Sequence, residues 1–511
     1  MRAPSLILLA TLVMAAGSTI AATDPAKAAA DAWRQTHEKQ ILDEFSSFVS
    51  LPDVATNIAD VDANAERLED MLRARGFSVR PLRASPGTPA TVFGERKVPG
   101  AKRTVLYYAH YDGQPVGQKG WASPPFMPTM RSGRLGDVNV RDVDWRTAPG
   151  PANPDWRLYA RAVADDKVTI EALLVAMDAL KAADIKLSVN IKLYYEGEEE
   201  QGSPHIAAIV EANKDVLKTD LIVMGDGPMH QSGRQMVNFG SRGYLGARMT
   251  VFGPLRPLHD GHYGSWAPNP AVEIARVIAS LRDDSGRILI PHFYDAVRPP
   301  TPAEKSALAA LPPIEALLAH DLGIVPITHE RLADSYFHPT LNVRAIHVGD
   351  EGPTAANAVA TQASASIDFR LTPGETPGDV KALTEHYLAS QGWLIVDAPP
   401  NLATRLANPK ILLLTWDEGS SMPVRTDIGA PAAKASVAAI QRVESEPVLE
   451  LPMVGASSGI AAMVTGLDAP MVGVSIANFD DNQHAENENI RIGNLWDGID
   501  VYAALLSELD W

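Results

Sequence analysis

The sequence contains no cysteine among its 511 residues. Disulfides, iron–sulfur clusters, cysteine-based zinc sites and thiol nucleophiles are therefore excluded. Any catalysis has to use carboxylates, histidine, serine, threonine, tyrosine or lysine. Any metal site has to be built from oxygen atoms and imidazole nitrogens.

An excess of positive charge is also missing. Lysine and arginine number 45 against 62 aspartate and glutamate residues, which gives a formal net charge of −17. Because nucleic-acid binding needs cations that displace counterions from phosphates, we expect no nucleic-acid partner. The share of apolar residues, 46%, is that of a globular protein and excludes a disordered chain, a collagen-like repeat and a coiled coil. At roughly 100–200 residues per domain, the length predicts about two to four domains.

Long apolar runs are confined to the N-terminus. Arg2 precedes an apolar run at positions 6–16, and small neutral residues follow it. This pattern is typical of a secretory signal peptide cleaved after Ala21 or Ala22, with an N-terminal membrane anchor or a frayed helix as the alternatives. No other stretch approaches the roughly 20 apolar residues of a membrane-spanning helix. We therefore expect residues 1–22 to be a signal peptide and the mature protein to be periplasmic or secreted, without a membrane span.

Strand and helix patterns alternate in two separate parts of the chain, residues 23–240 and 426–511. The strand candidates are residues 104–109, 187–195, 221–224 and 471–476. The amphipathic helix candidates are residues 30–49, 62–75, 167–182 and 493–509. This alternation predicts an α/β domain whose sheet has helices on both faces.

Residues 241–425 have a different pattern. Two strand candidates, at 245–251 and 363–371, alternate apolar and polar side chains. Helix candidates at 271–281 and 380–391 accompany them. We expect this segment to form a small α+β domain inserted into the larger α/β domain.

Acidic residues and histidines gather where predicted strands end. Five clusters show this: His110 with Asp112, Asp165 with Asp166, the acidic run at 196–200, Asp226, and His484. Taken singly, they are typical of a helix cap, a solvated acidic turn or a surface loop. Taken together they favour one site, because ligands of open α/β sheets bind at the carboxyl ends of the strands.

The combined set has the composition of a two-metal site. Two histidines, two aspartates and a glutamate would give three N/O ligands to each of two cations, with one carboxylate shared. Such ligands suit zinc, or manganese and cobalt. In the acidic run, one glutamate could ligate a metal while another acts as general base.

Several segments together resemble the co-catalytic zinc peptidases of the M20 family. They are YAHYDGQPV, ARAVADDK, YYEGEEEQGS, VMGDG and the late His484. The family includes carnosinase-like dipeptidases, glutamate carboxypeptidases, desuccinylases and deacetylases. The resemblance implies a zinc-exopeptidase-like α/β catalytic domain with a central mixed sheet flanked by helices, over residues 23–240 and 426–511. It also implies that residues 241–425 form an α+β lid or dimerisation domain.

The resemblance assigns the metal ligands residue by residue. His110 and Asp226 would hold one divalent ion, and Glu200 and His484 would hold the other. Asp165 would bridge both ions. All five ligand positions are occupied, so the resemblance gives no sign of an inactive enzyme.

The catalytic groups implied by the resemblance come from both domains. Glu199 would deprotonate the water bridged between the metals and then protonate the leaving amine, while Asp112 would orient the imidazole of His110. In the lid, His259 would stabilise the oxyanion, often from a partner subunit, with His262 as a nearby competitor. This role implies a homodimer formed through the lid.

The same resemblance implies substrate contacts at Arg370, Asn342 and Ser457. The planar guanidinium of Arg370 is suited to gripping a substrate carboxylate with two hydrogen bonds. The simpler alternatives are an arginine that pairs with a surface acid and a Gly/Ser loop that is a plain turn.

Two features depart from the family pattern. Ala162 and Val168 stand beside the expected bridging aspartate where the family usually has glycine. They crowd that turn and could change the pocket or the metal geometry. The loop at 124–156 is longer than usual and lies between two ligand segments, where it could cover the site.

These observations predict an exported metal-dependent exopeptidase, a dipeptidase or carboxypeptidase acting on small peptides. An N-acyl amino acid deacylase would use the same chemistry. A non-catalytic metal- or peptide-binding protein is an alternative of another class, but it would not need Glu199 as a free base beside Glu200. A serine hydrolase using Ser457 or Ser458 is disfavoured, because the G-x-S-x-G motif is missing.

Overall fold

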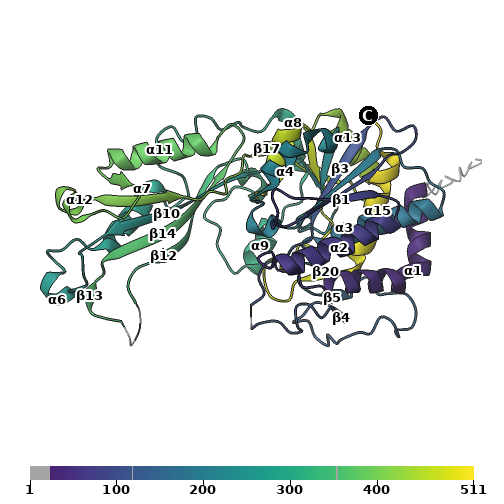
Figure 1. Cartoon of the computed structure of the whole chain (residues 1–511), viewed down its shortest axis with the longest axis horizontal. Helices are drawn as coiled ribbons and strands as arrows, with labels where there is room; N and C mark the ends of the chain where they lie inside the picture. The colour runs from purple at the N-terminus through teal and green to yellow at the C-terminus, as the bar shows by residue number, and fades with distance from the viewer. Residues whose placement is uncertain (1–23, 118, 351, 353–354) are drawn as a thin grey trace, which may run out of the picture.

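The computed structural model describes residues 24–117, 119–350, 352 and 355–511, so the predicted signal peptide lies outside the described residues. The elements form two lobes (Figure 1). The larger is built on an eight-stranded sheet, and the smaller on a five-stranded sheet. In the described ranges, no helix combines the length and the apolar character needed to cross a membrane.

The sheet of the larger lobe is mixed. Its strands, in spatial order, are β1 (Ser78–Leu82), β2 (Thr91–Arg96), β6 (Asn190–Glu196), β3 (Thr104–His110), β7 (Leu221–Met224), β19 (Met471–Gly473), β8 (Met236–Asn238) and β18 (Leu449–Leu451). The four central strands β6, β3, β7 and β19 run parallel to one another, whereas β2 is antiparallel to both of its neighbours, β1 and β6. Parallel strands end at the same edge, so residues that follow these four strands share one edge of the sheet.

Both faces of this sheet are buried. Along β3, Val105 and Tyr107 belong to one hydrophobic cluster, and Leu106 and Tyr108 belong to another on the opposite face. The first face is covered by α1 (Pro25–Val49), α2 (Ile58–Ala74), α3 (Lys167–Ala182), α13 (Pro431–Gln441) and α15 (Ile492–Glu508). The second is covered by α4 (Ile206–Ala212), α5 (Lys214–Leu217) and α14 (Ile460–Leu467). The predicted α/β architecture is confirmed.

Helix ends follow local capping chemistry. Helix α1 begins five residues before the predicted start, because the Asp24 side chain accepts the Ala26 N–H and Pro25 occupies the first turn. Helix α3 has the bounds predicted from its apolar periodicity. The apolar pattern locates the buried face of a helix, whereas the cap sets its first residue.

The smaller lobe has its own core. Its strands, in spatial order, are β12 (Thr340–His347), β14 (Gln362–Leu371), β10 (Gly243–Phe252), β16 (Ile411–Trp416) and β15 (Leu394–Val396). The inward residues of β10 are those expected from alternation, Leu245, Ala247, Met249 and Val251. They pack with residues of α7 (Pro270–Leu281) and α11 (Pro377–Ser390). The chain enters and leaves this lobe at one place, where β9 (Gly240–Ser241) pairs with β17 (Val424–Arg425).

Part of the inserted segment packs on the larger lobe. It contains α8 (Pro302–Ala310), α9 (Glu315–Asp321) and α10 (Leu332–Ser335). Leu308 and Phe337 pack with Met236 on β8 and Leu451 on β18, the last two strands at one side of the large sheet. Residues 241–425 therefore supply both the smaller sheet and a cover for one edge of the larger one.

Candidate metal centre and cleft

The parallel strands bring four chain segments to one edge of the large sheet. His110 is the last residue of β3, and Asp226 lies two residues beyond β7. The short helix η1 (Glu199–Gln201) follows β6 and contains Glu199 and Glu200. The loop after β19 contains His484, and Asp165 lies two residues before the start of α3. The expected metal ligands therefore come from five separate segments.

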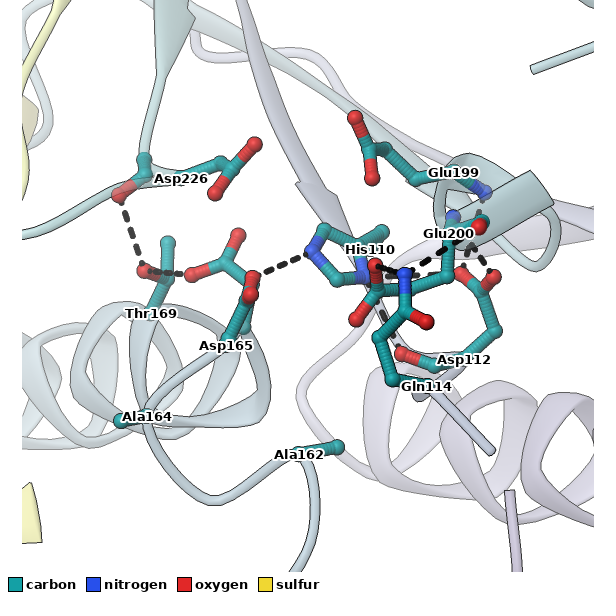
Figure 2. A network of polar contacts seen from close by, with 12 residues as sticks. His110, Asp112, Gln114, Ala162, Ala164, Asp165, Thr169, Glu199, Glu200 and Asp226 are labelled. Carbon is teal, nitrogen blue, oxygen red and sulfur yellow. Dashed lines mark hydrogen bonds and ion pairs between the residues drawn. The ribbon is translucent and has the colours of Figure 1, made fainter. Parts of the chain in front are cut away.

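These side chains lie within contact distance of one another. Nε2 of His110 is 2.8 Å from Oδ1 of Asp165. Nε2 of His484 is 3.1 Å from Oδ2 of Asp165 and 3.2 Å from Oε2 of Glu200. Asp165 thus presents one oxygen to each histidine. Figure 2 shows Asp165 facing His110, with the carboxylates of Glu199 and Asp226 directed into the neighbouring space.

Two overlapping groups have the composition of metal sites. His110, Asp165 and Asp226 form one, and Asp165, Glu200 and His484 form the other. Within each group the potential ligand atoms lie within 4.8 Å of one another. Imidazole nitrogen and carboxylate oxygen are donors that zinc, manganese and cobalt accept. The residues present fit a pair of divalent ions that share Asp165.

The centre concentrates negative charge in a buried place. Burial, together with the charge of Asp165, raises the pKa of Asp226 to about 7. Burial and the charge of Asp226 also raise the pKa of Glu199 well above its usual range. The hydrogen bond to Asp165 raises the pKa of His484 to about 11. Divalent cations would relieve this mutual repulsion of carboxylates.

Asp112 binds the start of η1, the short helix that contains Glu199 and Glu200. Its carboxylate accepts the backbone N–H of Glu199 at 3.2 Å and of Glu200 at 3.0 Å. Nδ1 of His110 lies 3.1 Å from the backbone oxygen of Asp112 and 3.4 Å from its carboxylate. Asp112 therefore lies where it can fix both the imidazole of His110 and the start of η1.

Gln114 was not identified from the sequence as a site residue. Its amide donates a 2.7 Å hydrogen bond to Oε2 of Glu200. This contact, between Gln114 and Glu200 in Figure 2, holds the carboxylate. The same carboxylate oxygen lies 3.2 Å from Nε2 of His484. In the sequence, only its position two residues beyond Asp112 indicated that Gln114 could belong to the site.

The carboxylate of Glu199 differs from that of Glu200. In the described residues no hydrogen bond to the Glu199 carboxylate is found, and it borders a cleft of about 910 Å³. On the larger lobe, His484 and the loop at 457–459 border the same cleft. On the smaller lobe, Tyr244 and Arg370 border it. A free carboxylate and a guanidinium group thus line one cavity.

Arg370 and Ser457 meet at this cleft. Nη1 of Arg370 donates a 3.0 Å hydrogen bond to Oγ of Ser457, which in turn donates to the backbone oxygen of Gly243. The Arg370 guanidinium also lies 5.3 Å from the centre of the Tyr244 ring. Arg344, which the sequence analysis did not single out, is a further cation on this wall.

Asn342 and His259 are not among the described residues that line the cleft. Asn342 is exposed on β12 and donates to Thr340. His259 ends β11 (Leu258–His259), which pairs with β13 (Ala358–Val359) and precedes α6 (Asp260–Tyr263). In Figure 1, β13 and α6 lie at the tip of the smaller lobe, far from β3. The His259 side chain is 61% exposed, and its ring centre lies 4.6 Å from that of His262, with the two rings tilted by 41°.

Comparison with known proteins places this geometry in context. The model of Peptidase family M20/M25/M40 matches residues 137–508. The chain is 24% identical over 431 residues to the Cys-Gly metallodipeptidase dug1 of Schizosaccharomyces pombe, covering 82% of this chain and 83% of that protein. It is 24% identical over 469 residues to the human Beta-Ala-His dipeptidase, covering 90% and 83%.

Solved structures show the same arrangement of elements. The M20 family metallo-carboxypeptidase Sso-CP2 from Sulfolobus solfataricus has a TM-score of 0.76 and 26% identity, covering 92% of this chain and 99% of that chain. Human carnosine dipeptidase 1 has a TM-score of 0.72 at 20% identity, covering 94% and 99%. The likeness extends over both lobes.

Proposed function

Because the chain belongs to Peptidase family M20/M25/M40 and is a metallopeptidase hydrolase, we propose that it is an exopeptidase acting on dipeptides or on the C-terminal bond of short peptides. One observation supports this most strongly. The carboxylate of Glu199, which has no hydrogen-bond partner in the part of the chain that the structure describes, lines the same cleft as the guanidinium of Arg370 and two candidate metal ligands, Glu200 and His484.

The proposal assigns the metal ligands by the two groups described above. Asp165 would be shared, with His110 and Asp226 on one side and Glu200 and His484 on the other. Two zinc ions bound there would polarise the scissile carbonyl and lower the pKa of the attacking water. Asp112 and Gln114 would keep His110 and Glu200 in place for this binding.

Glu199 would move the protons. Its carboxylate would accept a proton from the attacking water and then deliver it to the leaving amine. In the neighbouring residue, Glu200, the oxygen Oε2 already contacts both Gln114 and His484. The two glutamates therefore have separate tasks, which a protein that only binds metal would not need.

Arg370 would bind the free carboxylate at the end of the substrate. Its hydrogen bond to Ser457 and its ion pair with Asp368 hold the guanidinium at the cleft, where its remaining N–H groups can bind a carboxylate. The exposed His259 would complete the site from the lid of a second copy, because it lies far from the cleft of its own chain. The proposal therefore includes a homodimer formed through the smaller lobe.

Export is a further part of the proposal, supported by the N-terminal sequence pattern alone. Fractionation of cells that express the full chain tests it. We expect the protein in the periplasm or medium, shortened by about 22 residues. Full-length protein in the cytoplasm would contradict export.

A matched substrate panel tests the catalytic proposal. Glycyl-alanine, glycyl-alanine amide and N-acetyl-alanine differ at one end each, and each is incubated with zinc, with manganese and with chelator. We expect metal-dependent hydrolysis of the dipeptide and not of its amide. Hydrolysis of N-acetyl-alanine alone would favour the deacylase, and no hydrolysis by metal-loaded protein would favour a binding protein.

A further inference from the structure

Glu488 is a buried carboxylate near the metal centre and is not one of the candidate metal ligands. It lies four residues after His484, and 1% of the residue is exposed. Its Oε2 accepts hydrogen bonds from Nη1 of Arg161 at 2.8 Å and from the backbone N–H of Ala162 at 3.0 Å. Its Oε1 accepts the backbone N–H of Ala164 at 3.0 Å and of Asp165 at 3.1 Å. Four donors thus converge on one side chain.

Three of these donors belong to the turn that ends at Asp165. Ala162 has a φ of 56°, in the left-handed region, and its turn directs successive N–H groups to one point. Such a concave set of N–H groups is suited to an anion. Without Glu488 these buried N–H groups would lose their hydrogen-bond partner, which is unfavourable for a buried donor.

The same carboxylate belongs to the loop that bears His484. Next to it, the Asn487 side chain accepts the backbone N–H of Ala122 at 2.7 Å and donates to the oxygen of Gly120 at 3.0 Å. Glu488 also accepts through its backbone oxygen from Ala160 at 3.2 Å. The His484 loop is therefore fixed on both sides, and Glu488 joins it directly to the Asp165 turn.

We propose that Glu488 is a positioning residue that fixes Asp165 relative to His484, so that one aspartate can serve both metal ions. The inference rests on the metal ligands of the proposed function. It requires a carboxylate, because each of the two oxygens accepts two hydrogen bonds. An amide has one oxygen, and its NH2 group would face N–H donors on the other side.

Zinc affinity of the Glu488→Gln variant tests the proposal. Zinc binding is measured by competition with a chromophoric chelator in the full chain. We expect the affinity for at least one of the two ions to fall about 10–100-fold, as for other residues that orient metal ligands. Glu304→Gln is the matched control, because Glu304 is also a buried carboxylate that accepts hydrogen bonds from an arginine, Arg425, and from a backbone N–H, that of Thr301. Glu304 lies on α8 and is not part of the metal centre. We expect its zinc affinity to equal that of the wild type.

The outcomes separate this inference from the proposed function. If the wild type binds two ions and Glu488→Gln binds them with unchanged affinity, the positioning role is wrong. If the wild type itself does not bind two ions, the proposed function fails first. Should Glu488→Gln not fold, Glu488→Asp, which keeps both oxygens on a shorter side chain, replaces it. Weaker zinc binding by that variant supports the role, and wild-type affinity overturns it.

Discussion

Asp165 and His484 are far apart in the sequence, yet Oδ2 of Asp165 lies 3.1 Å from Nε2 of His484. The other oxygen of Asp165 lies 2.8 Å from Nε2 of His110. One carboxylate therefore faces both halves of the candidate metal centre.

Glu199→Gln is expected to bind metal normally and to lose turnover. The amide cannot accept and return a proton, so kcat for glycyl-alanine should fall by about 10²–10⁴-fold. Zinc content and kcat are measured on the same sample. Glu198→Gln is the control, because its carboxylate binds His205 instead of facing the cleft. A Glu199→Gln enzyme with near-normal kcat would exclude the general-base role.

Arg370→Gln is expected to weaken recognition of the substrate carboxylate. Loss of a hydrogen bond to a charged group costs about 1.5–3 kcal/mol, so kcat/KM for glycyl-alanine should fall about 10–100-fold. Most of the change should appear in KM. Arg248→Gln is the control, because Arg248 is an exposed arginine on β10, in the same five-stranded sheet as Arg370. Equal effects of the two substitutions would contradict the assignment.

Ala162 occupies a backbone conformation that favours glycine. Its φ is 56°, and the residue is fully buried. Ala162→Gly should change the free energy of unfolding by no more than about 1 kcal/mol, because relief of strain offsets the greater freedom of the unfolded chain. Ala162→Val should lower it by about 2 kcal/mol or more, since a branched side chain has neither the conformation nor the space. Urea unfolding measures both, and equal effects would refute the strain argument.

The pH dependence of stability has a contribution from Glu375 in the smaller lobe. Burial raises the pKa of this carboxyl to about 7 from its ordinary value of 4.5. Between about pH 4.5 and about pH 7, Glu375 is protonated to a greater extent in the folded state than in the unfolded state. The contribution of Glu375 to the free energy of unfolding is therefore full below about pH 4.5 and is lost as pH rises to about 7, by at most about 3 kcal/mol.

Glu375→Gln isolates this effect because glutamine does not titrate. Urea unfolding of wild type and variant is compared at pH 5 and pH 7.5. We expect the variant to gain stability relative to the wild type as pH rises. A difference between the two proteins that does not change with pH would contradict the account.

The sequence predicted much of the centre because strand ends are local features. His110 and Asp226 follow apolar runs that are recognisable as buried strands, and parallel strands bring their ends to one edge. Their convergence follows from the sheet, without knowledge of any loop. The same reasoning gave the cores of both lobes, because periodicity reports which side of a strand or helix is buried.

The other contacts depend on the course of the loops, which the periodicity of apolar residues does not predict. Glu488 meets the Asp165 turn only because a loop returns beside it, and Gln114 looked like an ordinary loop residue. Likewise, nothing in the apolar pattern of α8 showed that Leu308 packs on the larger lobe. Asn342 and His259 have roles implied by resemblance, but their own chain does not bring them to the cleft.

Zinc content per chain, measured after reconstitution in the wild type and in Asp165→Ala, tests the shared carboxylate most directly. Asp226→Asn, which removes a ligand from one half of the centre, is measured beside them. The account predicts two ions in the wild type, none in Asp165→Ala and one in Asp226→Asn. A wild type that holds a single ion, or an Asp165→Ala variant that keeps one or two ions, would contradict it.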